Sequence, residues 1–347
     1  MRCGDFRQTY AEDMAIFETP LPRVLLGALL VALCALPFVA SSFWMDVVNR
    51  IFIAVIAAMG LNILTGFTGQ ISLGNAAFLA VGAYSTAFLA GRLGLPFPVV
   101  IPAAGVLTAL IGMIFGVPSL RLKGLYLAVA TLAAHFVIEF TASHWESVTG
   151  GVNGTSIPAA KLGPLELGGD RKLFWLALGI TVLLLWFAKN LFRTKVGKAF
   201  VAIRDQDISA EVMGVNVFKY KLLSFGVSSF YVGVAGSLLA YQARIISPEN
   251  FPITVAIDQL GMIIIGGLGS VLGSIFGAVF VTLLPELLRL VTGGLSDSFP
   301  QLQGLFAPLK SGLFGLAIVL FLVFEPDGMA ARWHKIKAYW KLYPFSY

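Results

Sequence analysis

Long apolar segments alternate with short polar ones along most of this chain. A helix of about 20 apolar residues spans the hydrocarbon core of a bilayer, and most of the apolar segments approach that length. With approximate ends, they are 24–41, 47–64, 73–90, 97–117, 124–141, 173–189, 222–240, 256–266, 270–290 and 311–324. The pattern predicts an all-α integral membrane protein of about ten transmembrane helices. The eighth and tenth segments are short, which favours broken or re-entrant helices there.

The first apolar segment resembles a secretory signal peptide in length. The 23 residues before it, however, mix acidic and basic side chains, whereas a signal peptide starts with a compact basic stretch. The segment is therefore predicted to be the first membrane helix, preceded by a polar tail over residues 1–23.

Composition and charge support this fold class. The chain has 347 residues, of which 58% are hydrophobic and 12% are charged, about half the charged share of soluble domains. The net charge of +6 does not indicate nucleic-acid binding, because the basic residues lie in short loops and at the C-terminus. Cys3 and Cys34 are expected at different depths, so no disulfide is predicted.

The basic residues also predict the orientation in the membrane. Ten spans leave both termini on one side. Lysines and arginines are enriched in the turn 118–123, in the loop 190–221 and in the tail 325–347, which all fall on that same side. By the positive-inside rule this side is cytoplasmic. The loop 142–172 has no excess of positive charge and is expected to face outward, and residues 24–324 form the membrane domain.

A polar stretch, T-G-F-T-G-Q-I-S-L-G-N at residues 65–75, separates two apolar segments. Its glycines, Gly66, Gly69 and Gly74, permit a sharp break in the helix. Its polar side chains can cap the helix ends that the break exposes; these are Thr65, Thr68, Ser72 and Asn75. Two interpretations remain open: a polar turn at the membrane face, or a discontinuous helix that lines a transport path.

A second glycine-rich stretch, residues 261–278, resembles the first. Aligning Gly60 with Gly261 places T-G-F-T-G opposite G-G-L-G-S, which suggests an internal repeat. The stretch contains Gly266, Gly267, Gly269, Gly273 and Gly277. The last three recur every four residues, a pattern that lets helices pack closely. The stretch lacks the strand and the glycine spacing of a dinucleotide-binding site.

The loop 190–221 contains a predicted short helix. Asp205 or Asp207 would cap its start, Ile208, Val212 and Met213 would form an apolar face, and Gly214 would end it. Such a helix can dock into a groove on a soluble partner or lie on the lipid headgroups. The spacing of the residues does not distinguish these two arrangements.

The sequence offers little catalytic chemistry. It has no phosphate-binding loop of the G-x-x-x-x-G-K-[ST] type, no metal-ligand spacing among its histidines and cysteines and no evident nucleophile and base. We therefore expect neither an enzyme nor a metal or cofactor site. His135 and Glu139, four residues apart in the fifth segment, are compatible with a proton relay or with a carboxylate that simply reaches water.

Several motifs together resemble a known family. They are G-L-N-I-L-T-G-F-T-G-Q-I-S-L-G-N-A-A-F-L-A-V-G-A-Y (60–84), R-L-K-G-L-Y-L-A-V-A-T-L (121–132), T-G-G-V-N-G (149–154), A-E-V-M-G-V-N-V-F-K-Y-K-L-L-S-F (210–225) and G-G-L-G-S-V-L-G-S-I-F-G-A (266–278). Over roughly residues 45–347 the chain is similar to permease subunits of bacterial high-affinity branched-chain amino-acid ABC importers. Its E-P-D-G and Y-P-F-S-Y endings resemble the longer of the two permease subunits.

This resemblance implies an ABC-importer permease architecture in the bacterial inner membrane. The implied partners are a second related permease, two ATP-binding cassette ATPases and a periplasmic substrate-binding protein. The short cytoplasmic helix would be a coupling helix in an ATPase groove, with Asp207, Ala210, Glu211, Met213 and Gly214 at its core. The polar break would line the translocation path through Asn62, Thr65, Gln70, Ser72 and Asn75.

Two other functions fit the same features. A urea or short-chain amide permease would share the break, the coupling segment and the tail. A stand-alone secondary transporter would work without ATPases and would need a buried ion-coupling acid pair, for which only His135 and Glu139 are candidates.

Overall fold

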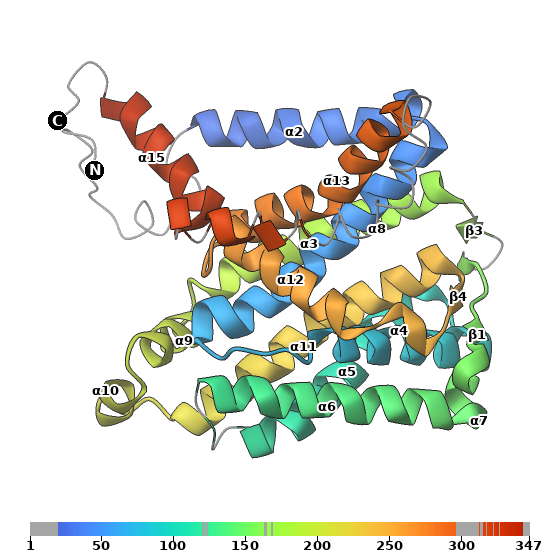
Figure 1. Ribbon diagram of the computed structural model, residues 1–347, viewed down its shortest axis with the longest axis horizontal. Coiled ribbons are helices and arrows are strands. Elements are labelled where there is room, and N and C mark those ends of the chain that lie inside the picture. Colours follow the sequence, from blue (N-terminus) through green and yellow to red (C-terminus); the bar gives the residue numbers. More distant parts are fainter. Residues whose placement is uncertain are drawn as a thin grey trace.

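The computed structural model describes residues 20–119, 122, 124–162, 165–167, 169–295, 312, 315–316, 318–321, 323–325 and 327–342. Most of these residues are helical (Figure 1). The helices are α2 (Pro20–Val39), α3 (Ser42–Thr68), α4 (Asn75–Gly91), α5 (Phe97–Ser119), α6 (Leu125–His144), α7 (Glu146–Thr149), α8 (Asp170–Leu191), α9 (Lys195–Asp205), α10 (Asp207–Val212), α11 (Val217–Ala243), α12 (Ile253–Gly266), α13 (Val271–Leu295) and α15 (Gly328–Leu342).

Two small antiparallel sheets accompany the helices. Strand β1 (Thr155–Ser156) pairs with β4 (Ile245–Ile246), and β2 (Ala160–Leu162) pairs with β3 (Leu165–Leu167). Two 3₁₀ turns, η1 (Gly151–Asn153) and η2 (Pro248–Asn250), lie near them in the chain. These strands are too short to alter the helical fold class.

The predicted membrane character agrees with the structure, whereas the predicted number of spans is not confirmed. Within the described residues, 6 helices are long and apolar enough to cross a membrane. They are Ser42–Thr68, Phe97–Pro118, Leu125–His144, Asp170–Leu191, Val217–Ala243 and Val271–Arg289. Helix α4 and the apolar part of α2 are shorter, and α12 has 14 residues. The tenth predicted span, 311–324, lies largely outside the described residues.

Helices α3 and α11 form the centre of the bundle. Helix α11 packs against α3, α4 and α5, while α3 also contacts α8, α12 and α13. Every residue of α3 from Val55 to Thr68 is buried, as expected of a helix that is apolar on all sides. Small residues allow these helices to approach closely: Gly82 of α4 lies directly against the backbone of Gly233 in α11.

The bundle has two distinct ends (Figure 1). Helices α9 and α10, from the predicted loop 190–221, lie at one end together with α15, from the predicted tail 325–347. The described part of the predicted loop 142–172, with α7 and the short strands, lies at the opposite end. Segments that the charge pattern assigns to one side therefore share one end of the molecule.

Candidate functional site

The polar stretch at residues 65–75 contains a true interruption between two helices. Helix α3 ends at Thr68 and α4 begins at Asn75. Gly69 has a φ of 73°, in the left-handed region that favours glycine. Its N–H bonds to the carbonyl of Thr65 at 3.1 Å, and the next N–H, of Gln70, bonds to the carbonyl of Leu64 at 3.0 Å. The end of α3 is thus closed by backbone amides.

The predicted side-chain caps are therefore wrong in detail. The cap residue of α4 is Gly74, and no side chain caps that helix by a hydrogen bond. The Thr65 hydroxyl instead donates to the carbonyl of Gln70 at 3.1 Å, and the Thr68 hydroxyl donates to Ile63 at 3.0 Å. Because Gly69 and Gln70 supply the closing amides, the polar side chains are free to make other bonds.

A second interruption, at residues 267–270, lies against the last turns of α3, where Gly66 meets the backbone of Gly269. Gly267 and Gly269 have φ values of 120° and 71° between α12 and α13. Asn62 of α3 is fully buried and bonds to the second interruption and the start of α13. Its amide group donates to the Ser270 carbonyl at 2.9 Å and to the Ser274 hydroxyl at 2.7 Å, and its Oδ1 accepts the Gly269 N–H at 2.9 Å. We call the two interruptions and Asn62 the break junction.

Arg204, at the end of α9, contacts both sides of the break junction. Its Nη1 donates to the carbonyl of Gly66 at 3.2 Å, and its aliphatic part covers Gly69. A Cβ on Gly269 would come within 2.9 Å of the same Nη1. Arg204 also bonds Asp205 through Nε and Nη2, both at 3.0 Å. The arginine therefore connects the α9–α10 segment to the two helix breaks.

The five predicted path residues, Asn62, Thr65, Gln70, Ser72 and Asn75, are all buried around this junction. Gln70 donates to the Ser224 hydroxyl of α11 at 2.7 Å, and Asn75 donates to Gln259 of α12. Ser72 accepts the N–H of Gly74 at 3.3 Å. In this conformation the side chains bond to one another and to neighbouring helices.

Sequence reasoning missed Arg204, Ser224 and Gln259 as parts of this site. The last two were visible in the sequence only as polar residues within the apolar segments 222–240 and 256–266. Their partners were not detectable, since Gln70 and Ser224 are separated by 154 positions and Asn75 and Gln259 by 184.

The remaining glycines of the second stretch lie where α12 packs against α13. Gly277 faces the backbone carbonyl of Met262, and Gly273 faces those of Gly266 and Gly267. Side chains larger than hydrogen have no room at these contacts. Gly269 lies in the interruption before α13. It is therefore not part of the helix face on which Gly273 and Gly277 recur every four residues.

Helix α10 has a well-formed C-terminal cap. Gly214 has a φ of 86°, and the N–H groups of Gly214 and Val215 bond to Glu211 and Ala210 at 2.9 and 3.0 Å. This is a Schellman C-cap. Ala210 is buried, whereas Ile208, Val212 and Met213 are 63%, 82% and 84% exposed.

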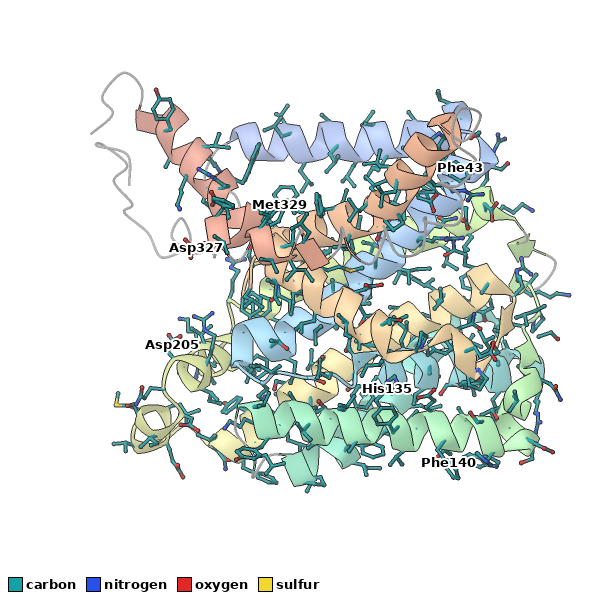
Figure 2. All side chains as sticks on the ribbon, viewed as in Figure 1. Phe43, His135, Phe140, Asp205, Asp327 and Met329 are labelled. Atoms are coloured by element: carbon teal, nitrogen blue, oxygen red, sulfur yellow. The ribbon has the colours of Figure 1, made fainter. Side chains whose placement is uncertain are left out.

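The start of α10 differs from the prediction that Asp205 or Asp207 caps it. Gln206 occupies the cap position, and its side chain makes no capping bond. Both aspartates are engaged elsewhere: Asp205 pairs with Arg204 at 3.0 Å, and Asp207 pairs with Lys221 at 3.4 Å. The Asp207–Lys221 pair ties α10 to α11, whereas the Arg204–Asp205 pair lies within α9. Figure 2 shows Asp205 at the end of the molecule where α10 projects.

Comparison with known proteins identifies the family. Residues 43–322 match the family described as the permease component of the branched-chain amino acid transport system. The chain belongs to this family of transport permeases. The resemblance stated from the motifs is thereby confirmed.

Individual relatives of this permease cover most of its length. The high-affinity branched-chain amino acid transport system permease protein LivM of Escherichia coli is 33% identical over 90% of this chain and 76% of its own. LivM of Salmonella typhimurium is 34% identical over the same shares. A probable branched-chain amino acid transport permease protein LivH of Methanocaldococcus jannaschii is 24% identical over 82% of this chain and 90% of its own. No solved structure matches this permease.

Proposed function

We propose that this chain is the membrane permease subunit of an ATP-driven importer for branched-chain amino acids. The observation that carries the proposal is the 33% identity to LivM over 90% of the chain. The chain would form the translocation path, while ATPases on other chains hydrolyse ATP. No residue of this chain is assigned a catalytic role.

The complete importer would contain a second related permease, two ATP-binding cassette ATPases and a periplasmic binding protein, in the bacterial inner membrane. Relatives named both LivM and LivH support a pair of related permeases. The end that carries α9, α10 and α15 would face the cytoplasm with both termini. This orientation rests on the basic residues of those segments.

Helix α10 is proposed as the coupling helix that docks into an ATPase. Its three exposed apolar side chains, Ile208, Val212 and Met213, offer a surface typical of helix-in-groove binding. The helix projects beyond the bundle (Figure 1), which favours a soluble partner over the membrane surface. Its C-cap and the bonds of Asp207 keep it rigid enough to transmit a displacement. Ala210, Glu211 and Gly214 complete the docking segment.

We expect the double substitution Val212→Asp and Met213→Asp to abolish docking. Two carboxylates would have to be desolvated in an apolar groove, which costs several kcal/mol. The ATPases should no longer co-purify with the permeases, and ATP-dependent uptake should fall at least about tenfold. The control pair Val212→Leu and Met213→Leu keeps the apolar surface and should retain both properties. Normal co-purification of the aspartate variant would instead place α10 on the lipid headgroups.

The break junction is proposed as the polar part of the translocation path. Interrupted helices leave backbone groups that are satisfied only by protein or by a water-filled path. The bonds of Gln70 to Ser224 and of Asn75 to Gln259 join separate helices. Breaking them during alternating access would expose amide groups that can exchange partners with the substrate.

Replacing Gln70 and Asn75 together by leucine should reduce uptake about tenfold or more, because charged and polar substrate groups lose these partners. The complex should still assemble, since leucine is close to these amides in size. The matched control is Thr86→Val, which removes a buried bond between α4 and Ser237 of α11, at 2.7 Å, away from the junction. Unchanged uptake by the double variant would remove the junction from the path.

The decisive experiment is uptake into proteoliposomes that contain this chain, its second permease, the ATPases and the binding protein. Leucine uptake that requires both ATP and the binding protein is the expected result. Uptake of urea in place of leucine would keep the importer and change its substrate. Uptake by this chain alone, without ATP, would indicate a stand-alone transporter and overturn the proposal.

A further inference from the structure

A small hollow lies between α4, α6 and the turn η2, apart from the break junction. Its volume is about 10 Å³, room for one group about the size of a water molecule. Most of its wall is apolar and consists of Ala77, Ala80, Ile138, Ala142, Pro248 and Phe251. Three polar residues complete it: Tyr84 of α4, and His135 and Glu139 of α6. Figure 2 shows His135 on the side of α6 that faces the other helices, away from both ends of the bundle.

Three buried polar atoms in this hollow lack hydrogen-bond partners within the described protein. The hydroxyl of Tyr84 and both ring nitrogens of His135 are buried and make no hydrogen bond. The two residues are only 6% and 1% exposed. Oε2 of Glu139, whose side chain is 42% exposed, lies 3.6 Å from Nε2 of His135. Buried polar groups without a partner are costly and therefore indicate that another molecule bonds to them.

The residues of the wall select the chemistry of that molecule. A neutral imidazole nitrogen, a phenol oxygen and a carboxylate can all accept hydrogen bonds. The only acid of the wall is Glu139, and none of its members is a lysine or an arginine. The hollow therefore favours a group that donates several hydrogen bonds and carries a positive charge, and disfavours an anion. The free space is enough for the ammonium group alone.

We propose that this hollow binds the ammonium group of a primary aliphatic amine, held by Glu139, His135 and Tyr84. If the proposed function holds, the bound group is the α-ammonium of the imported amino acid. Tyr84 lies nine residues beyond Asn75 in α4, which corresponds to roughly 14 Å along the helix. The substrate would then contact two polar sites along α4, the hollow and the break junction.

Binding can be tested without ATP or the binding protein. The purified permease assembly would be titrated calorimetrically with 3-methylbutylammonium chloride, and with 3-methylbutanol and 3-methylbutanoate, which share the aliphatic chain but are neutral and anionic. Saturable binding of the ammonium compound alone is expected. Leucine should compete for the same site.

Two near-isosteric variants and two matched controls locate the site. Glu139→Gln removes the charge and should weaken amine binding about tenfold or more, and Tyr84→Phe removes one hydroxyl and should weaken it roughly threefold to tenfold. The controls are Tyr126→Phe and His144→Gln, at exposed positions of α6, and they should bind as the unmodified protein does. Equal melting temperatures would show that the variants are folded.

Three results would overturn the inference. Absent amine binding would make the hollow a hydration site only, equal binding of the alcohol would show an apolar pocket without charge selection, and unchanged affinity in Glu139→Gln would place the amine elsewhere. Amine binding without competition by leucine would reject the assignment to the imported substrate. These outcomes are distinct from failure of the uptake assay, because the titration requires no transport.

Discussion

Substitution of Arg204 by alanine is expected to reduce substrate uptake at least about tenfold while ATP hydrolysis by the assembled importer continues. The reason is the position of the guanidinium group between the proposed coupling helix and the helix breaks. It donates to the Gly66 carbonyl at 3.2 Å and lies against both Gly69 and Gly269. Asp205, which it also bonds, is the last residue of α9 and lies two positions before the start of α10.

A displacement of α10 would therefore reach the break junction through one side chain. Hydrogen bonds from charged groups contribute about 1.5–3 kcal/mol, enough to change the balance between two conformations about tenfold to a hundredfold. Without Arg204, the ATPases could still close against α10. The two breaks would no longer follow that movement.

The measurement is the number of ATP molecules hydrolysed per leucine imported. Arg204→Lys should give an intermediate ratio, because lysine keeps the charge but lacks the planar fork that contacts Gly66 and Asp205 together. Lys198→Ala, at an exposed position of the same helix, is the control and should not change the ratio. A parallel loss of hydrolysis and uptake would assign Arg204 to assembly, and a normal ratio in Arg204→Ala would exclude it from coupling.

Much of the helical architecture could be predicted from the sequence, because the length of an apolar segment can be read from consecutive residues. The predicted segments 47–64, 97–117 and 222–240 lie within α3, α5 and α11. The number of crossings could not be predicted in the same way. Helices of 17 and 14 residues, α4 and α12, adjoin interruptions that are covered by other helices, so their length alone does not say how they lie in a membrane.

The site was predictable in position but not in its contacts. Clustered glycines indicated both interruptions, since their backbone conformations are local. The role of Asn62 depends on Ser270 and Ser274, which are 208 and 212 positions away. In the hollow, the spacing of His135 and Glu139 on one helix was visible, whereas the approach of Tyr84 from α4 depends on how two helices pack. Non-local pairs of this kind leave no periodic pattern.

Substitution of Gly277 by alanine is expected to destabilise the permease by about 3 kcal/mol, at the upper end of typical overpacking effects. A Cβ at this position would collide with the backbone carbonyl of Met262 and come within 3.1 Å of the Gly266 N–H group. Neither neighbour is a flexible side chain that could move aside. Helices α12 and α13 would have to separate, which would also disturb the adjoining interruption at residues 267–270.

Thermal unfolding in detergent, with Gly179→Ala as the matched control, would measure this effect. Gly179 lies within α8, and no heavy atom lies within 4 Å of the place that an added methyl group would occupy. Since alanine favours a helix over glycine by up to about 1 kcal/mol, this control should melt at the same temperature or slightly higher. Gly277→Ala should melt several degrees lower and accumulate less in the membrane. Equal melting temperatures for the two variants would mean that α12 and α13 do not pack in close contact at Gly277, and the second helix break would then lose the support that holds it against Asn62.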